Sequence, residues 1–324
     1  MIHSMFRHND KIKSRPGIAE LPADGGFLWI DVGQADAATL AELRACYNID
    51  PQLQHSSVHE DEEYVYLLAE IVAMNEQREP EFHKVTFVLG ERLLVTLHDR
   101  PEFTPLNRAL QRLARRPKQA TDARALLQMI LAGINDGTSQ VIEQIAESLE
   151  KSADTIAQLS SETTAAGSRE LGVSDLTETM LDLNDIEELI SRSLESQLAL
   201  ARVVRYLNGE VNTRAEPDLQ TLIDELIADV NSVKEHAEFE HDKVRYLQNS
   251  VVGLLNIKQN QIVKVFTIIT AVFLPPTLVA TFYGMNFAVM PELSWKHGFT
   301  MSIVLTLIAA LLPLIYIKRK GWLR

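Results

Sequence analysis

Cysteine is almost absent from this chain of 324 residues, and that scarcity excludes two classes of protein. The single cysteine, Cys46, supports neither a disulfide framework nor a zinc site built from several thiolates. It lies in a segment expected to be helical, and we interpret it as a small buried hydrophobic residue. The first residues, MIHSMFRHNDKIK, also lack an apolar run of signal-peptide length, so the amino terminus is expected to stay in the cytoplasm.

Positive charge is scarce as well, and it is distributed unevenly. The formal net charge is −13, from 31 basic and 44 acidic residues. The first 262 residues contain 25 of the basic and 43 of the acidic residues, which gives them a net charge of −18. Such a body repels nucleic acid and raises the local concentration of cations, although solubility alone explains the same excess equally well.

Residues 1–105 are expected to form a small cytoplasmic α/β domain, because short runs rich in apolar residues indicate strands there. The predicted strands are 27–32, 64–73, 84–89 and 92–97. Gly90 and Glu91 join the last two as a hairpin, so the sheet is expected to be partly antiparallel. A short helix is predicted over 36–47. Residues 1–25 show no clear period and are expected to form a loose, irregular segment.

Residues 106–262 are predicted to be almost wholly helical, because apolar residues recur there at spacings of three and four. TTAAGSRELG (163–172) and NGEVNTRAEP (208–217) contain helix breakers and are the predicted turns. From Pro217 to Phe282 the sequence predicts one helix of 66 residues, about 100 Å long at ~1.5 Å per residue. Only part of that length fits in a bilayer, so the rest forms a cytoplasmic stalk. The acidic faces of these helices are more simply solvated surfaces than ion sites.

Residues 263–324 are expected to form a membrane domain. The segments 265–282 and 298–317 contain 18 and 20 uncharged residues, close to the roughly 20 that a hydrocarbon core requires. The core helix of a soluble protein is the alternative, and two adjacent runs of this length argue against it. Basic residues before the first run and after the second place both ends inside. The expected order is a first span at 263–283, an outer loop at 284–297, a second span at 298–317 and a cytoplasmic tail at 318–324.

Polar residues recur along one side of the first span, at steps of three and four. This threonine stripe consists of Thr267, Thr270, Leu274, Thr277 and Thr281, and Asn260 and Val263 continue it backwards. Threonine hydroxyls in a helix commonly bond to their own backbone, but four on one stripe favour a face turned to neighbouring helices or water. Pro275 and Pro276 also remove amide donors from the carbonyls of Ala271 and Val272. Because one helix cannot enclose a pore, a conduit requires several copies around an axis.

The link between the spans carries two short motifs, Gly284-Met285-Asn286 and Met290-Pro291-Glu292-Leu293. This segment, with the flanking spans and the terminal KRKGWL, resembles the CorA family of magnesium and cobalt transport proteins. The family is marked by a Gly-Met-Asn triplet at the outer end of the first of two spans and by an acidic loop after it. The close resemblance covers about the last 65 residues, and the rest of the chain agrees with the family in outline.

The resemblance implies an α+β protein that assembles as a homopentameric channel in the inner membrane, with the first spans lining the pore and the stalks forming a cytoplasmic funnel. It implies an ion entrance in which the Asn286 carbonyl meets hydrated Mg²⁺, Gly284 permits a tight backbone course and Glu292 attracts cations. Met285 is the middle residue of the triplet that the resemblance implies as the selectivity filter. The implied pore-lining residues are Asn260, Val263, Phe266, Leu274, Thr277 and Asn286. For the same helical turn, the three- and four-residue spacing indicates Thr267 as the pore-lining residue, whereas the resemblance implies Phe266.

The resemblance further implies that divalent ions bind between cytoplasmic subunits and hold the pore shut. The positions that bind them in well-described members correspond to Ser232, Gln54 and His55 here, so that site does not transfer. The stretch KEHAEFEHDK offers substitutes: Glu235, His236, Glu238, Glu240, His241 and Asp242. A solvated helix face explains the same charges. Apolar Val263 and Leu274 are candidates for a constriction that closes by dewetting.

Three other functions compete with Mg²⁺ transport. A zinc transporter of the same superfamily usually lacks the methionine of the triplet, which is present here. A membrane-anchored scaffold or sensor without ion flux does not explain the polar stripe or the proline pair. An enzyme is the least favoured, because the sequence contains no P-loop, Gly-x-Ser-x-Gly or His-Glu-x-x-His motif. Mg²⁺ is therefore expected as cargo and regulator, with Co²⁺ and Ni²⁺ unranked and the membrane potential as driving force.

Overall fold

The computed structural model covers the whole chain and describes all residues except 1, 9–10, 24, 51–57, 76, 101–102, 116–119, 165–172, 215, 286–289 and 322–324. The chain forms two compact units. The first contains residues 1–156 and 178–248, and the second contains residues 157–177 and 249–324. We describe each unit by itself.

A seven-stranded mixed sheet forms the base of the first unit, with strand order β2-β1-β3-β7-β6-β5-β4. β3 and β7 pair in parallel, and every other neighbouring pair is antiparallel. The strands are β1 (Ile2–His8), β2 (Lys11–Pro16), β3 (Leu28–Gly33), β4 (Val58–Glu60), β5 (Val65–Met74), β6 (Pro80–Leu89) and β7 (Leu93–His98). The four strands predicted from apolar runs, the hairpin at Gly90 and the partly antiparallel sheet are confirmed.

The expectation of a loose segment at residues 1–25 is wrong, because β1 and β2 are strands. β1 pairs with both β2 and β3, so it lies inside the sheet rather than at its edge. Its buried Ser4 breaks the apolar alternation. The Ser4 hydroxyl donates to the Gly17 carbonyl at 2.6 Å and accepts from the Ala19 amide at 3.1 Å. A polar residue whose hydrogen bonds are satisfied can be buried in a strand at little cost, and apolar periodicity does not detect it.

The sheet buries a different set of side chains on each face, as the two-residue period of a strand requires. In β3, Trp29 enters one core while Leu28 and Ile30 enter the other. The first core continues into the long helices, and the second is covered by α1 (Ala37–Tyr47), which contributes Leu43. The predicted helix at 36–47 is confirmed. Cys46 is exposed on it, so the interpretation of Cys46 as a buried residue is wrong.

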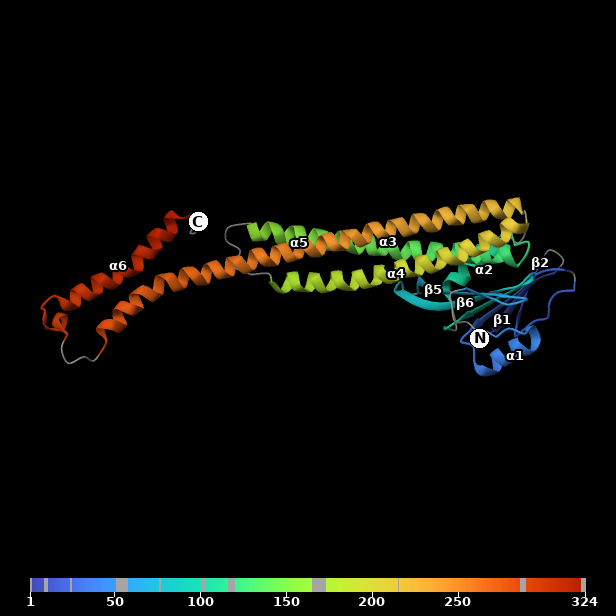
Figure 1. Cartoon of the computed structure of the whole chain (residues 1–324), viewed down its shortest axis with the longest axis horizontal. Coiled ribbons are helices and arrows are strands. Elements are labelled where there is room, and N and C mark those ends of the chain that lie inside the picture. The colour runs from blue at the N-terminus through green and yellow to red at the C-terminus, as the bar shows by residue number, and fades with distance from the viewer. Residues whose placement is uncertain are drawn as a thin grey trace. The chain divides into compact units, whose positions relative to one another are not determined.

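Four helices follow the sheet: α2 (Thr104–Arg115), α3 (Ala123–Thr164), α4 (Val173–Arg214) and α5 (Pro217–Tyr283). Within the first unit, α3, α4 and α5 lie side by side and share one apolar core (Figure 1). α5 is a single helix, as predicted, and its 67 residues are one more than the 66 expected. The predicted turn at 208–217 is largely wrong, because α4 stays helical through Gly209 to Arg214. The other predicted turn was 163–172, and its residues 165–172 lie outside the described part of the chain.

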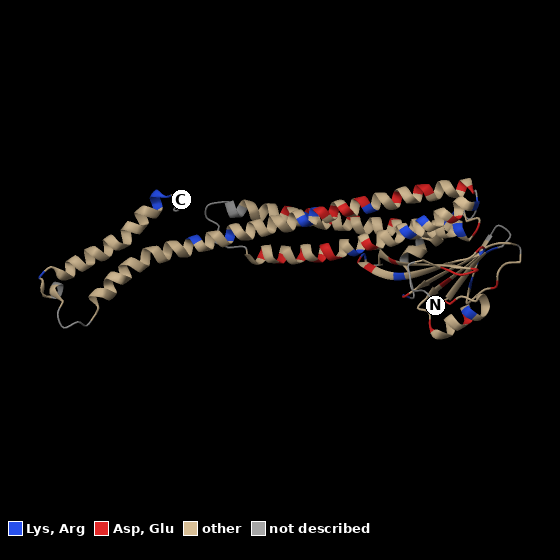
Figure 2. Ribbon diagram, viewed as in Figure 1, with Lys and Arg blue, Asp and Glu red and all other residues tan. Residues whose placement is uncertain are grey.

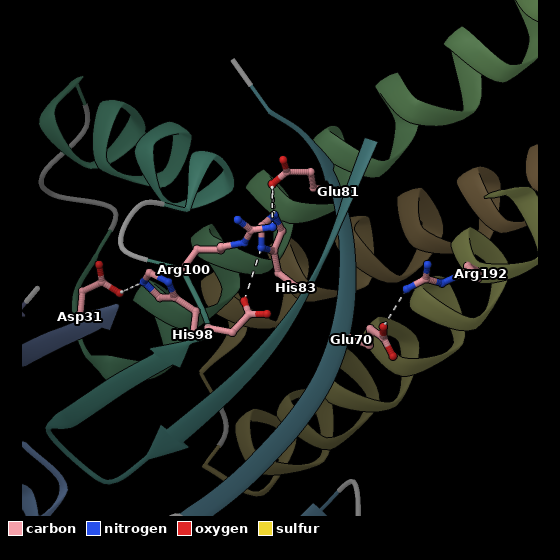
Figure 3. Close-up of polar contacts among 8 residues, drawn as sticks. Asp31, Glu70, Glu81, His83, His98, Arg100 and Arg192 are labelled. Carbon is pink, nitrogen blue, oxygen red and sulfur yellow. Dashed lines mark hydrogen bonds and ion pairs between the residues drawn. The ribbon is translucent and has the colours of Figure 1, made fainter. Parts of the chain in front are cut away.

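The helices are fixed to the sheet at β5. Within the described part of the chain, β4 pairs with residues 65–67 of β5 and no strand pairs with Val72 on that side. The Val72 amide donates to the Ser196 hydroxyl of α4 at 3.1 Å, and its carbonyl accepts from the Thr138 hydroxyl of α3 at 3.2 Å. Arg192 of α4 adds an ion pair with Glu70 at 3.3 Å (Figure 3). Helix side chains thus satisfy the backbone groups that an edge strand leaves unpaired.

The second unit contains the end of α5, the short 3₁₀ helix η3 (Pro291–Ser294) and α6 (Gly298–Arg319). Within the described residues, α5 and α6 are the two helices long and apolar enough to cross a membrane. In the most apolar 18-residue segment of each helix, 0% of the residues of α5 and 6% of those of α6 are buried. The core helix of a soluble protein would be mostly buried. Figure 2 shows acidic residues along the helices of the first unit and basic residues near the end of α6.

Candidate ion entrance and pore face

The carboxy-terminal end of α5 is closed by backbone hydrogen bonds at Gly284. The Gly284 amide donates to the carbonyls of Ala280 at 3.0 Å and Thr281 at 3.2 Å, which satisfies acceptors of the last turn. A Cβ atom added at Gly284 would lie 3.2 Å from the Ala280 oxygen, tighter than ordinary van der Waals contact. Positive φ values in the described chain occur at Gly17, Gly25 and Gly321 among the glycines, and Gly284 does not share them. The glycine therefore permits close approach and not a left-handed backbone.

The predicted entrance residues lie in the link between α5 and α6. Met285 follows Gly284 directly and is exposed. The backbone of Glu292 lies in η3, which precedes α6 by three residues. Asn286, the residue to which the resemblance gives the main role, lies outside the described residues, as does the Glu292 side chain. The structure thus places Gly284 and Met285 directly after the carboxy-terminal end of α5.

One face of α5 in the second unit is hollowed into an open depression of about 500 Å³. Its lining repeats at steps of three and four, and consists of Val263, Phe266, Thr267, Thr270, Ala271, Leu274 and Pro275. The structure therefore brings three predicted pore-lining residues, Val263, Phe266 and Leu274, onto one face. Phe266 and Thr267 both line it, although periodicity and the resemblance had each selected only one of them. Asn260 and Thr277 lie one turn before and after this lining, and both are exposed.

Each threonine of the stripe donates its hydroxyl hydrogen to the carbonyl four residues earlier in α5. The oxygen–oxygen distances are 2.7 Å for Thr267 and Thr281, 2.9 Å for Thr270 and 2.6 Å for Thr277. A hydroxyl has one hydrogen to donate and two lone pairs to accept with. Because the hydrogen is already used inside the helix, each hydroxyl offers only acceptor capacity to whatever lies beside the stripe.

The proline pair adds acceptors to the same stretch. α5 remains helical through Pro275 and Pro276, which have no amide hydrogen. The carbonyls of Ala271 and Val272 consequently lack the donor that a helix normally supplies from four residues later. Ala271 and Pro275 both line the depression. In a lipid-embedded helix such carbonyls need water or a neighbouring helix as partner.

The four predicted regulatory residues, Glu235, His236, Glu238 and Asp242, are all exposed on α5. The Glu238 carboxylate lies 3.2 Å from the Lys234 ammonium group, so its charge is already paired. The one buried acid of the stretch is Glu240, which lies 3.4 Å from Lys243 and 3.7 Å from His236. Sequence reasoning did not separate Glu240 from its neighbours, although its helical phase relative to the apolar residues marks it as inward-facing.

Two buried histidines form a second polar cluster, at the end of the sheet next to Phe103 (Figure 3). His83 of β6 lies 3.5 Å from Asp99 and 3.8 Å from Glu81, and His98 of β7 lies 3.2 Å from Asp31. Within the described ranges, no three His, Cys, Asp or Glu side chains are arranged to hold a metal ion. We interpret the cluster as a structural element of the sheet.

Comparison with known proteins identifies relatives over most of the chain. The family described as CorA-like Mg²⁺ transporter protein matches residues 24–319. A magnesium transport protein CorA from Haemophilus ducreyi is 32% identical over 269 residues, covering 82% of this chain and 79% of that protein. Its Escherichia coli counterpart is 34% identical over 242 residues, covering 74% and 71%.

The fold also matches a solved structure over its full length. The complete structure of the CorA magnesium transporter from Methanocaldococcus jannaschii superposes with a TM-score of 0.76 at 18% identity, covering 100% of this chain and 99% of that one. This likeness confirms the fold: a mixed-sheet domain, long helices and two carboxy-terminal helices that are candidates to cross a membrane.

The histidine cluster predicts that the first unit loses stability in acid. Burial lowers the pKa of His83, and nearby Asp99 and Glu81 only partly oppose this effect. The unfolded chain therefore binds a proton more readily, so the contribution of His83 to stability is complete above pH ~6.5 and is lost as pH falls below it. We expect His83→Gln to shrink the difference in Tm between about pH 7.5 and 5.5, measured on the detergent-purified protein.

The matched control is His3→Gln, which removes an exposed histidine from the same sheet. It should leave the pH dependence of Tm as in the unmodified protein. If His83→Gln and His3→Gln give the same pH profile, His83 does not carry the acid sensitivity.

Proposed function

The chain belongs to the CorA-like Mg²⁺ transporter family, and from this premise we propose that it conducts Mg²⁺ into the cytoplasm through a pore formed by several copies, five by analogy with the family. The protein would lie in the inner membrane with both ends in the cytoplasm. The proposed cargo includes Co²⁺ and Ni²⁺ besides Mg²⁺. Members of this family are transporters, and neither an enzymatic role nor a flux-free scaffold is favoured.

The observation that carries this proposal is the hydrogen bonding of the threonine stripe. Mg²⁺ holds its water tightly and prefers to move with part of that shell intact. The hydrogens of metal-bound water point away from the ion, so the shell needs acceptors around it. Hydroxyls whose own hydrogens are used inside α5 supply acceptors and no competing donors. Neutral acceptors also bind the water shell without trapping the ion, whereas a ring of carboxylates would trap it.

The proposed entrance follows the same principle. Asn286 would offer its side-chain oxygen to metal-bound water while its amide nitrogen donates to neighbouring backbone. Glu292, outside the conduit, would raise the local cation concentration, and Gly284 would keep the end of α5 compact. Val263, Phe266 and Leu274 place apolar side chains between polar turns of the same face, where narrowing would expel water and stop conduction.

The proposed driving force is electrical. Moving two positive charges inward across about 100 mV releases about 4.6 kcal/mol, at ~2.3 kcal/mol per charge. We expect proteoliposomes with an inside-negative potential to take up Mg²⁺ faster than those without one. Asn286→Ala should slow this uptake about tenfold or more, because a net ~1 kcal/mol hydrogen bond lost in each copy adds up to more than the ~1.4 kcal/mol that changes a rate tenfold.

The matched control for that experiment is Asn231→Ala, which removes an exposed amide from the stalk of the same helix. Each variant is compared with a size profile in detergent, so that loss of assembly is recognised. Near-normal uptake by correctly assembled Asn286→Ala would contradict a role for Asn286 in ion entry and leave the triplet with only a structural role as a turn. Uptake that ignores the potential but requires ATP would contradict the driving force.

We also propose that internal Mg²⁺ closes the pore by binding between stalks. Glu235 and Asp242 are exposed, seven residues apart on one face of α5, and like charges meeting there in neighbouring copies would repel until a divalent ion relieved them. His236 and Glu238, also predicted from the sequence, are involved in contacts with Glu240 and Lys234. We therefore give Glu235 and Asp242 the larger share of this regulation.

The double variant Glu235→Gln/Asp242→Asn should keep conducting at internal Mg²⁺ concentrations that close the unmodified channel. The measurement is initial uptake into proteoliposomes preloaded with increasing Mg²⁺. Glu238→Gln, which removes an acid already paired with Lys234, is the control and should shift the inhibitory concentration much less. Unchanged inhibition in the double variant would place the regulatory site elsewhere.

A further inference from the structure

The cytoplasmic part of α5 carries a buried stripe and an exposed stripe, and both repeat every seven residues. The buried stripe comprises Ala237, Glu240, Val244, Leu247, Val251 and Leu254, and it ends at Lys258. The exposed stripe comprises Glu235, Phe239, Asp242, Tyr246, Asn249 and Gly253. A straight helix drifts by ~20° per seven residues, so a strict repeat of seven is typical of helices that wind around one another in a left-handed supercoil.

The seven-residue spacing of the exposed stripe continues in the sequence as far as the proposed pore face. Seven-residue steps from Tyr246 lead through Gly253 to Asn260, Thr267 and Leu274, all of them exposed in the single chain. Phe239, Tyr246 and these residues therefore occupy equivalent positions of one heptad repeat in the sequence of α5.

Phe239 and Tyr246 are unusual on a cytoplasmic helix surface. They are 65% and 70% exposed, more than any other large hydrophobic side chain in the described residues outside the membrane helices and the link between them. The other residues of the exposed stripe between Glu235 and Gly253 are acidic, amide or glycine. A large aromatic side chain buries about 150–250 Å² when it is covered, so these two positions dominate any apolar contact along the stripe.

The occupant of this surface follows from the membrane topology. Copies inserted in one membrane point the same way, so their α5 helices are parallel and equal heptad positions meet in register. A lipid acyl chain does not fit, because Tyr246 precedes the uncharged run at Val265 by 19 residues, about 28 Å of helix. The partner is a second copy of this chain.

We propose that Phe239 and Tyr246 form two aromatic layers in which the stalks of neighbouring copies touch and narrow the cytoplasmic part of the ion path. This inference rests on the proposed function. The layers lie on either side of Asp242, so a carboxylate ring is enclosed between two apolar rings. Gly253, one heptad beyond Tyr246, has no side chain and leaves the path wide before the pore face begins.

Disulfide trapping tests the contact, since the chain needs only Cys46→Ser to become free of cysteine. A disulfide requires Cβ atoms about 3.5–4.5 Å apart, a separation that equivalent seam positions reach and outward positions do not. Tyr246→Cys and Phe239→Cys, each introduced into that background, should form disulfide-linked dimers when membranes are oxidised. The control is Arg245→Cys. Arg245 precedes Tyr246 in sequence and is also exposed, but its side chain lies about 100° around the helix from that of Tyr246.

Uptake by the same proteoliposomes tests the constriction. Oxidation should slow Mg²⁺ uptake by Tyr246→Cys, reduction should restore it, and Arg245→Cys should respond to neither. The aromatic contact is overturned if neither Phe239→Cys nor Tyr246→Cys forms dimers, or if Arg245→Cys forms as many dimers as they do. Normal Mg²⁺ uptake in the same experiment would leave the transport proposal intact. Dimers with unchanged uptake overturn the constriction. Absence of uptake in the Cys46→Ser parent itself is instead a failure of the proposed function.

Discussion

A cation that keeps its water shell needs hydrogen-bond acceptors along its path, and one face of α5 carries such acceptors. Mg²⁺ gives up water reluctantly, so a path for it must satisfy outward-pointing water hydrogens without holding the ion. Four threonine hydroxyls on one face use their hydrogens inside the helix and present oxygen outward. The proline pair leaves two further carbonyls without their helical donors. Local backbone chemistry thus produces an acceptor-rich surface with no charged group on it.

The first unit holds the amino-terminal part of the same helix. α3 and α4 bond to the Val72 backbone of β5, and both share an apolar core with α5. The seven-residue repeat of the buried stripe fixes the rotation of α5 along the stalk. Because buried and exposed stripes belong to one helix, that rotation also determines which side chains remain exposed.

Much of this architecture could be predicted from the sequence, because it rests on apolar periodicity. β3, β5, β6 and β7, the length of α5 and both membrane helices follow from it. Where burial depends on hydrogen bonds, periodicity fails: β1 was missed because Ser4 is buried through paired polar groups. The predicted turn at Gly209 was wrong because tertiary packing tolerates an isolated glycine within a helix. Cys46 is exposed although its residue type favours burial.

For the site, the sequence predicted residue identities better than contacts. It indicated the triplet at 284–286, but the reason for Gly284 is a close approach to the Ala280 carbonyl that only coordinates reveal. It grouped the acids of 235–242 together, and it did not show that Glu240 is buried while Glu238 is paired with Lys234. Such differences depend on helix rotation and on neighbours that are distant in sequence.

The central claim is that the threonine face of α5 lines a water-filled ion path, and thiol accessibility tests it most directly. In the Cys46→Ser background, Thr270→Cys is treated with a membrane-impermeant cationic methanethiosulfonate reagent, and Mg²⁺ uptake is measured before and after. Ile269→Cys, one residue away around the helix, is the control. The account predicts that modification blocks uptake through Thr270→Cys and spares Ile269→Cys. Full uptake through Thr270→Cys after its modification has been verified by mass spectrometry would contradict it.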